Sequence, residues 1–390
     1  MCEGTAFFYL TISKKNRIFA KPKALKTMKN FFFIFVFSIL YNFVHATDSL
    51  RAYYSMVAKA EWAVCEGNFS QVASLYRIAF LYNANPFYTD ILRALNAELE
   101  LADLDTIIIE QYFRQILLTR GWHAVERTHT DNFLNRFRIG RLGNNIEKLI
   151  SQYFSADTSD LQLKIMLMHS EDQRVRRESM GFLDTCYSGT LYDRRIVYTD
   201  SINNLKLLEL LRTNPEILDE NVVGFSTVQQ IETLLMHQTY TSFDAREYLL
   251  QAVRDGIFDA RTYARLSDRY HLFVSRDNDT LAGVFSGDYF GTHNLWNFEV
   301  PNEKSLSLIF TDERNRTIKN NRRAEIFLGD ILDASFREFC MRNRGGTQRT
   351  FLLSMDELNS MLNHFRDINI QFDYYIANEK DFDFNFKRTE

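Results

Sequence analysis

Apolar residues recur every three to four positions along most of this chain, which is the spacing of one face of an α-helix. The first such stretch is 51–66, and a second, 69–82, follows a break at Gly67-Asn68. Two further stretches, 87–101 and 104–119, make another pair. The pattern predicts two helical hairpins over 47–121.

The helical period resumes after a mixed connecting segment, 122–160. It predicts further helices over 161–182, 200–211, 226–237, 243–254, 259–270, 317–327 and 351–365. Asp160 is a candidate cap for the first of these, and Asp200 or Ser201 for the second. Asn214-Pro215 should end the second, and Gly256 suits a left-handed C-cap.

A smaller part of the chain lacks the helical period. Residues 271–300 are irregular or β, and 368–376 alternate as a strand does. Only 4 Pro and 15 Gly occur in 390 residues, whereas β-sandwiches need many turns. We therefore expect a mainly α fold: repeat-like N-terminal hairpins over 47–121, a mostly helical domain over 161–330 with a small irregular or β segment, and a C-terminal extension over 331–390.

A short apolar run near the start, 31–44, is preceded by Lys29 and followed by Val-His-Ala46. This is the layout of a secretory signal peptide over 28–46, and the run is too short to span a bilayer. We expect cleavage near Ala46 and a periplasmic or secreted protein; an uncleaved anchor is the alternative. Residues 1–27 are a spurious upstream extension, or else a long basic leader, before the usable start at Met28.

Excluding 1–46 changes the charge. The full chain carries 46 basic and 50 acidic residues; without seven basic and one acidic residue of the leader, the net charge is −10. A negative chain argues against a nucleic-acid partner, and a membrane is met only transiently, through the signal peptide. Cys65, Cys186 and Cys340 are too far apart for a metal pair or a disulfide framework, although one disulfide is open.

The N-terminal hairpins resemble tetratricopeptide repeats. The residues that carry the likeness are Gly67, Phe69, Val72, Ala73, Tyr76, Ala79, Phe80 and Pro86, with Trp62 upstream. Two consecutive helix pairs at about the repeat period support it. An ordinary antiparallel bundle with small Ala contacts is the alternative.

The region 165–330 resembles an uncharacterised domain of exported Bacteroidetes proteins. The ordered matches are Asp172-Gln173 with Arg176, Asp200 with Asn203, Gly224, His237, Asp268-Arg269 and Gly291-Thr292. The chain departs from the pattern at Met236, Phe290 and His293, which puts a shared activity in doubt. The resemblance implies a fold and no established activity.

Those residues also carry the candidate chemistry. His237 ends an apolar helix, where imidazole acts as a general base or as a hydrogen-bonded core residue. Asp172 and Arg176 are four residues apart, which gives an intrahelical ion pair or a polar cluster facing a cleft. We take His237, Asp172, Asp268 and His293 as catalytic candidates, and Arg176, Arg269, Gln173, Gly291 and Thr292 as ligand-binding candidates.

No known catalytic signature accompanies these residues. The sequence has no H-E-x-x-H, G-x-S-x-G, P-loop or G-x-G-x-x-G motif, so we predict no metal and no cofactor. We expect an exported helical binding protein for a protein or cell-envelope ligand. The alternative is a hydrolase-type enzyme with a His/Asp/Arg cleft centred on His237.

Overall fold

A computed structural model describes thirteen stretches of the chain. They are 47–119, 159–183, 194–238, 242–274, 290–292, 295–299, 306–311, 313–331, 333–335, 337, 352–354, 373–377 and 384–388. The predicted leader, most of the connecting segment, Cys186 and Cys340 lie outside them. Residues Ser49–Glu390 form one compact unit.

The mainly α fold is confirmed. The N-terminal part consists of antiparallel helices in succession: residues 47–66, α2 (Phe69–Tyr82), α3 (Tyr88–Leu99) and α4 (Thr106–Arg114), which continues as a π-helical turn, Gln115–Thr119. Gly67, with φ of 73°, makes the first turn, and the Asn68 side chain accepts a hydrogen bond from the N–H of Gln71. These local signals place α2 between the residues that its apolar period predicted.

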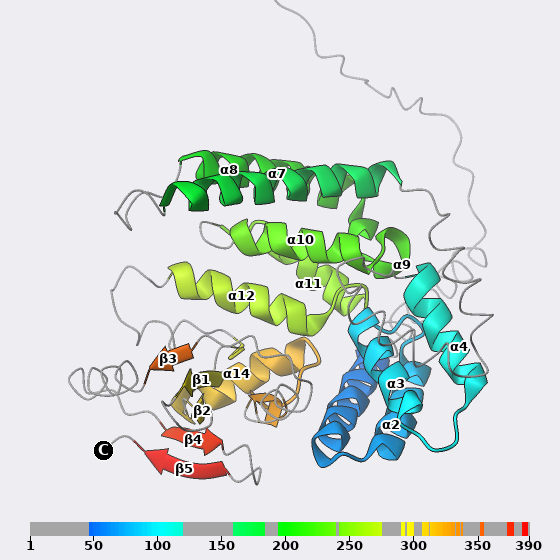
Figure 1. Ribbon diagram of the computed structural model, residues 1–390. Coiled ribbons are helices and arrows are strands. Elements are labelled where there is room, and N and C mark those ends of the chain that lie inside the picture. The colour runs from blue at the N-terminus through cyan, green and yellow to red at the C-terminus, as the bar shows by residue number, and fades with distance from the viewer. Residues whose placement is uncertain are drawn as a thin grey trace, which may run out of the picture. The chain divides into compact units, whose positions relative to one another are not determined.

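A second group of helices follows, and Figure 1 shows α7 and α8 side by side above α10. Contacts join α7 to α8, both of these to α10, α10 to α12, and α12 to α11. The bounds are α7 (Asp160–Leu183), α8 (Arg194–Thr213), η3 (Pro215–Leu218), α9 (Glu220–Val223), α10 (Phe225–Gln238), α11 (Arg246–Arg254), α12 (Ala260–Val274) and α14 (Glu313–Glu325).

Two helix starts differ from the expected ones. Ser159 caps α7 in place of Asp160: its hydroxyl accepts from the Gln162 N–H, and the Gln162 side chain accepts from the Ser159 N–H. This is a reciprocal capping box. Helix α8 begins at Arg194, so Asp200 and Ser201 lie inside it and cap nothing. The Ser201 hydroxyl donates to the Val197 carbonyl instead.

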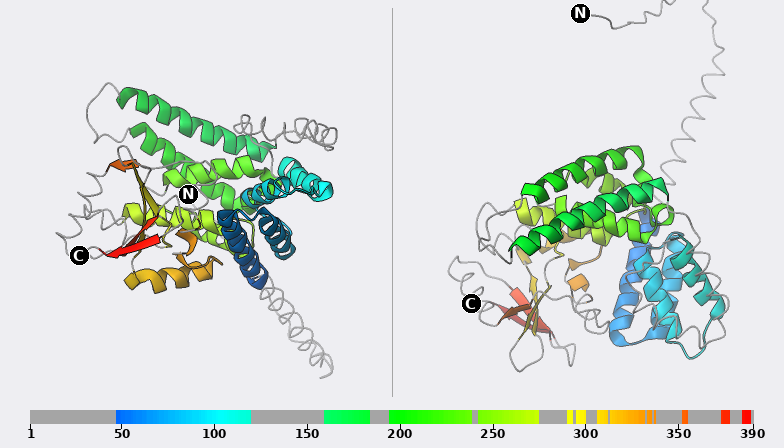
Figure 2. Two further views of the ribbon diagram at one scale, coloured as in Figure 1. Left: turned by 60° about the horizontal axis from the view of Figure 1, so that its bottom comes forward. Right: turned by 45° about the horizontal axis from the view of Figure 1, so that its top comes forward.

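A five-stranded sheet has the order β3-β1-β2-β4-β5 and stands together in both views of Figure 2. All pairs are antiparallel except β1 with β3. The strands are β1 (Leu295–Glu299), β2 (Leu306–Thr311), β3 (Leu352–Ser354), β4 (Asp373–Ala377) and β5 (Phe384–Arg388). The prediction of a helix from 351 was wrong at β3, and the predicted strand matches β4 in part.

A buried ionic cluster, here called the Asp90 network, joins the N-terminal helices to α12. The Asp90 side chain is fully buried; it accepts from the Tyr53 hydroxyl at 2.6 Å and from both Arg261 Nη atoms at 2.9 and 2.8 Å. Glu61 pairs with Arg93 at 2.6 Å and with Arg337 at 3.2 Å. The residues of the network come from segments that lie up to 276 residues apart in the chain.

Within the described stretches, no helix combines the length and the apolar character needed to span a bilayer.

Candidate acid–base cluster

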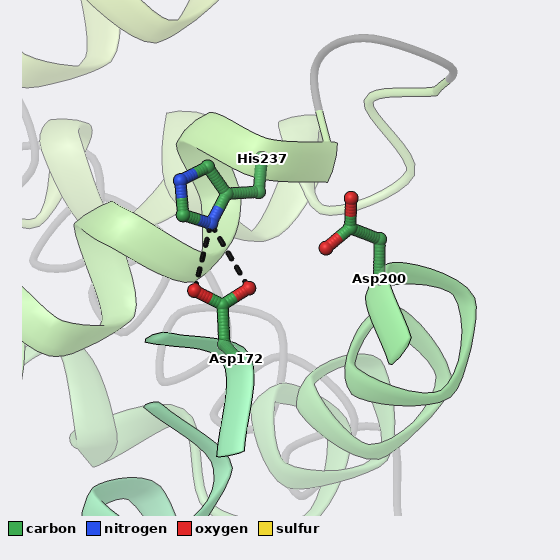
Figure 3. A group of neighbouring side chains, drawn as sticks. All are labelled: Asp172, Asp200 and His237. Carbon is green, nitrogen blue, oxygen red and sulfur yellow. Dashed lines mark hydrogen bonds and ion pairs between the residues drawn. The ribbon is translucent and has the colours of Figure 1, made fainter. Parts of the chain in front are cut away.

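Four side chains from three helices meet where α7, α8 and α10 pack together. Asp172 and Arg176 lie one turn apart on α7, Asp200 lies on α8, and His237 lies in the last turn of α10. Figure 3 shows the imidazole of His237 above the Asp172 carboxylate, with Asp200 to one side. We call these four residues the His237 cluster. Each of the three helices packs its apolar face against the others, and this packing brings the four side chains together.

The central contact joins His237 to Asp172. The Nδ1 atom of His237 lies 3.0 Å from each carboxylate oxygen of Asp172. Asp172 is 1% exposed and also accepts from the Gln173 side-chain amide at 2.8 Å. A buried carboxylate at this distance holds the proton on Nδ1, so the lone pair of the neutral ring is on Nε2.

Arg176 bridges the two aspartates. Its Nη2 donates to Asp200 Oδ1 at 2.5 Å and lies 3.3 Å from Asp172 Oδ1. Its Nε donates to the two Asp172 oxygens at 3.3 and 3.4 Å and also lies 3.1 Å from His237 Nδ1. One ring nitrogen cannot donate and accept at once, and Nδ1–H donates its hydrogen bond to the carboxylate. We therefore assign the Arg176 Nε–H to Asp172 and not to Nδ1.

The pKa values of the two aspartates move in opposite directions. Burial raises the pKa of Asp172, but the hydrogen bond from His237, the charge of that ring when it is protonated, and Arg176 outweigh burial and lower the pKa below its usual value. Burial also raises the pKa of Asp200, and here the attraction of Arg176 does not offset it. Two acids in one cluster therefore differ in the ease with which they take a proton, a pattern found at acid–base sites.

The cluster combines one enclosed side chain with three that are partly exposed. Asp172 is enclosed, whereas the side chains of His237 and Arg176 are each 16% exposed and that of Asp200 15%. Within the described stretches, His237 Nε2 and Arg176 Nη1 take part in no hydrogen bond. These two atoms are the ones in the cluster that keep hydrogen-bonding capacity for a ligand.

The same atoms could also hold a metal ion. Ligand atoms of Asp172, Asp200 and His237 lie within 4.8 Å of one another. However, the guanidinium of Arg176 already contacts both carboxylates and supplies the positive charge there. A divalent ion would have to displace a permanently charged side chain and the Nδ1 proton. The geometry therefore favours an arginine-filled cluster over a metal centre.

The structure brings together only part of the predicted site. Asp172, Gln173, Arg176 and His237 converge, whereas Asp268 and Thr292 belong to another contact. His293 lies outside the described residues. Arg269 Nε donates to the Met236 carbonyl at 3.2 Å, so Arg269 serves the end of α10 beside His237.

Asp268 fastens a short buried loop. Its carboxylate is fully buried and accepts from the backbone N–H of Phe290 at 2.5 Å and of Thr292 at 2.7 Å. Gly291, between them, has a φ of 78°, which suits a residue without a side chain. Arg323 Nη1 also donates a hydrogen bond to the Phe290 carbonyl of the same loop at 3.1 Å. The role seen for Asp268, Gly291 and Thr292 is to hold this loop.

Asp200 is the member of the cluster that was predicted as a helix cap and was not among the catalytic or ligand-binding candidates. Its short polar side chain is typical of a cap, and the residues before it gave no strong helical period. Its place in the Asp-x-x-Asn pattern was the one available signal.

No protein-family model, no curated protein and no solved structure matches this chain.

Proposed function

We propose that this protein is a hydrolase-type enzyme in which His237 is the general base. The observation that carries the proposal is the 3.0 Å contact between His237 Nδ1 and the buried carboxylate of Asp172. A carboxylate in this position orients the ring, fixes its tautomer and stabilises the imidazolium that forms when Nε2 takes a proton.

The other two members have supporting roles. Arg176 offsets part of the charge of Asp172 and Asp200, and its Nη1, which makes no hydrogen bond to the described residues, is the donor we assign to a bound ligand. Asp200 holds the guanidinium in place through the 2.5 Å hydrogen bond. Gln173 fills a further acceptor position on Asp172.

The energetic cost of the cluster supports a function beyond stability. Buried ion pairs are often replaced by apolar residues without loss of stability, because desolvation offsets most of their attraction. Three helices that needed only to pack could use apolar contacts here. A partly exposed charged cluster built around a buried carboxylate is a good candidate for an active site.

The first test measures the base itself. Diethyl pyrocarbonate acylates neutral imidazole, and peptide mass spectrometry locates the modified residue among the eight histidines. We expect His237 to react faster than His169 and His271 at pH 7. His271→Gln should leave that labelling unchanged, while Asp172→Asn should slow it. A His237 that stays unlabelled in the folded protein contradicts the proposal.

A second candidate, an exported binding protein for a protein or cell-envelope ligand, rests on the outer surface of the N-terminal helices. Leu81 is 84% exposed and Ile107 78%, and Phe69, Ile78, Tyr82 and Leu104 are exposed as well. Exposed apolar groups of this kind mark interaction surfaces. Binding to an isolated envelope fraction that is lost in Leu81→Asp and Ile107→Asp, but kept in His237→Gln, would favour this candidate.

Both candidates include export through the predicted signal peptide. N-terminal sequencing of the protein recovered from the periplasm or medium of a bacterial host tests this. We expect Thr47 as the first residue, and retention of the intact leader in the cytoplasm contradicts it.

A further inference from the structure

Helices α2 and α4 lie side by side in the N-terminal part of the chain. Arg77 on α2 pairs at 3.9 Å with Asp105, the residue that caps α4. The rings of Phe80 on α2 and Tyr112 on α4 meet edge to face, with centroids 5.5 Å apart. The two contacts join an earlier residue of α2 to an earlier residue of α4 and a later one to a later one. The helices therefore run in the same direction.

The exposed side of these two helices, here called the α2–α4 face, is apolar at its centre. The apolar residues are Ile78, Leu81 and Tyr82 on α2, and Leu104 and Ile107 around the start of α4. Leu81 and Tyr82 follow Ile78 by three and four residues, so the three share one side of the helix. Ile78 and Leu104 are the sequence neighbours of the Arg77–Asp105 pair, which brings the two halves of the face together.

Each charged side chain on the two helices has a partner within the chain. Helix α2 has one charged residue in 14, Arg77, whose guanidinium donates two hydrogen bonds to the buried carboxylate of Glu98. The charged residues of α4, Glu110 and Arg114, pair with each other at 3.2 Å. The α2–α4 face can therefore be covered without burying an unpaired charge.

We propose that the α2–α4 face docks the same face of a second copy of this chain, in a two-fold homodimer. A two-fold interface brings one surface against itself, and two uncharged apolar faces are complementary in that arrangement. The chain without residues 1–46 has a net charge of −10, so a second copy is repelled unless it docks where charges are absent or paired. This inference is independent of the His237 proposal, and it names a protein partner for the surface on which the second candidate function rests.

The size of the face fits such an interface. A specific interface takes about 800 Å² from each partner. With about 200 Å² for a fully exposed large side chain, the five apolar residues of the face expose on the order of 600 Å², which is the upper end of what monomeric proteins leave uncovered. Three exposed neighbours without charge, Gln71, Ser74 and Gln111, supply the polar rim of the interface.

An anionic bilayer fits the face less well than a second copy does. Helices that lie on such membranes carry Lys and Arg beside their apolar side. Here Glu98 already binds the one basic residue of α2, Arg77, and the segment before α4 adds the carboxylates of Asp103 and Asp105. Anionic lipid headgroups would repel these carboxylates.

The experiment measures the mass of the chain from Thr47 by analytical ultracentrifugation; this chain contains the whole compact unit Ser49–Glu390. We expect an equilibrium that shifts from monomer to dimer as the protein concentration rises. Leu81→Asp and Ile107→Asp should each weaken association by about tenfold or more, because each buries two unpaired carboxylates in the dimer. Higher ionic strength should strengthen association, because salt screens the repulsion between two acidic chains.

The matched control is Leu205→Asp. Leu205 on α8 is also an exposed leucine, at 65%, but it lies outside the α2–α4 face, so its substitution should leave association unchanged. Leu81→Ser and Ile107→Ser remove the same apolar contacts without adding a charge, and they should weaken association to a smaller extent. They keep the test decisive if an aspartate variant folds poorly. Tm should change little in all of these variants, because the substituted side chains are exposed.

Three results would overturn the proposal. The first is a chain that stays monomeric at every concentration, and the second is a dimer that persists unweakened in the Leu81 and Ile107 variants. The third is a monomer that binds neutral phosphatidylcholine vesicles or an isolated envelope fraction and loses this binding in Leu81→Asp, which assigns the face to that ligand. Labelling of His237 by diethyl pyrocarbonate should be equal in all variants, so failure of the dimer and failure of the general base are distinguishable.

Discussion

The Nδ1 atom of His237 and the carboxylate of Asp172 meet at 3.0 Å although 65 residues separate them in the chain. The contact ties the last turn of α10 to the middle of α7. It has a structural consequence, because Asp172 is buried, and a chemical one, because no hydrogen bond among the described residues occupies Nε2.

The structural consequence is a pH-dependent stability. The folded-state pKa of Asp172 is lowered, so its charge stabilises the fold above the usual Asp pKa and the contribution is lost as pH falls through the folded value. We expect Asp172→Asn to lose roughly 3 kcal/mol at pH 7, since it removes one partner of a buried pair. Urea unfolding from pH 7 to pH 3 checks this. The difference in free energy of unfolding between wild type and variant should become smaller as the pH falls. A difference that does not depend on pH contradicts the proposed link between the Asp172 charge and stability.

Arg176 should act as the cation that keeps a metal out of the cluster. In Arg176→Ala the ligand atoms of Asp172, Asp200 and His237 are freed from it, and they lie within 4.8 Å of one another. We expect this variant to bind Zn²⁺ in calorimetry and the wild type not to, because Zn²⁺ favours nitrogen and carboxylate ligands. Adding His237→Ala should abolish the binding. Equal Zn²⁺ binding by wild type and variant contradicts the prediction.

Glu232 on α10 should destabilise the protein at alkaline pH. Burial raises its pKa to about 7, with partial opposition from Arg265 at 3.3 Å. An acid whose pKa is higher in the folded state than in the unfolded state destabilises the fold at pH values above the folded-state pKa. This destabilisation disappears as the pH falls toward the unfolded-state pKa. At pH 8, Glu232→Gln should therefore raise the free energy of unfolding by at most about 3 kcal/mol. The gain should be smaller than this limit because the Glu232 side chain is 22% exposed. At pH 5 the substitution should change the free energy of unfolding little.

The control for Glu232 is Glu209→Gln, which removes a carboxylate that is 57% exposed in the last turns of α8. Denaturant unfolding at pH 5 and pH 8 should show little change for the control. A Glu232 variant that is equally stable relative to wild type at both pH values contradicts the raised pKa.

The Asp90 network should hold the N-terminal helices to α12. Burial raises the pKa of Asp90, but the charge and hydrogen bonds of Arg261 outweigh it, so the carboxylate stays charged. Asp90→Ala leaves Arg261 without its main partner, and we expect a loss of about 3–5 kcal/mol in urea unfolding.

The exposed Arg212–Glu209 pair gives the comparison for that measurement. Arg212→Ala should cost less than about 1 kcal/mol, since surface ion pairs contribute little. An Asp90 variant as stable as the Arg212 variant would show that the network is dispensable.

Gly256 should tolerate no side chain. Its φ is +71°, and an added Cβ would lie 2.9 Å from Leu50 Cδ2. Its N–H bonds to the Val253 carbonyl while that of Ile257 reaches Ala252, the Schellman arrangement that ends α11. We expect Gly256→Ala to cost more than about 1 kcal/mol. Gly329→Ala, where a Cβ meets nothing within 4 Å, should be nearly neutral, and equal effects contradict the argument.

Short-range signals predicted much of the fold. The period of α2 placed it between Phe69 and Tyr82, and Asn214-Pro215 and Gly256 ended helices as expected. The start of α8 was wrong by six residues, because Asp200 has the side chain of a cap and the pairing with Arg176 cannot be read locally. Residue type gave no sign that the Asp90 network exists, since Asp90 and Arg261 are 171 residues apart.

The same holds for the site. The four-residue spacing of Asp172 and Arg176 indicated one helix face, and one of the two interpretations given above was a polar cluster that includes His237. Asp268 was grouped with them because Asp268-Arg269 belongs to the same ordered set of motifs. Its side chain instead satisfies two backbone N–H groups, a demand that arises only once the loop is folded.

The contacts of the first described helix reach far along the chain. Trp62 donates to Asp333 at 2.7 Å and Glu61 pairs with Arg337, separations of 271 and 276 residues. During synthesis, this helix cannot complete those contacts until residue 337 has left the ribosome. Non-local contacts also slow folding, because a long loop must close before they form. The first helix therefore completes its native contacts only when most of the chain has been synthesised.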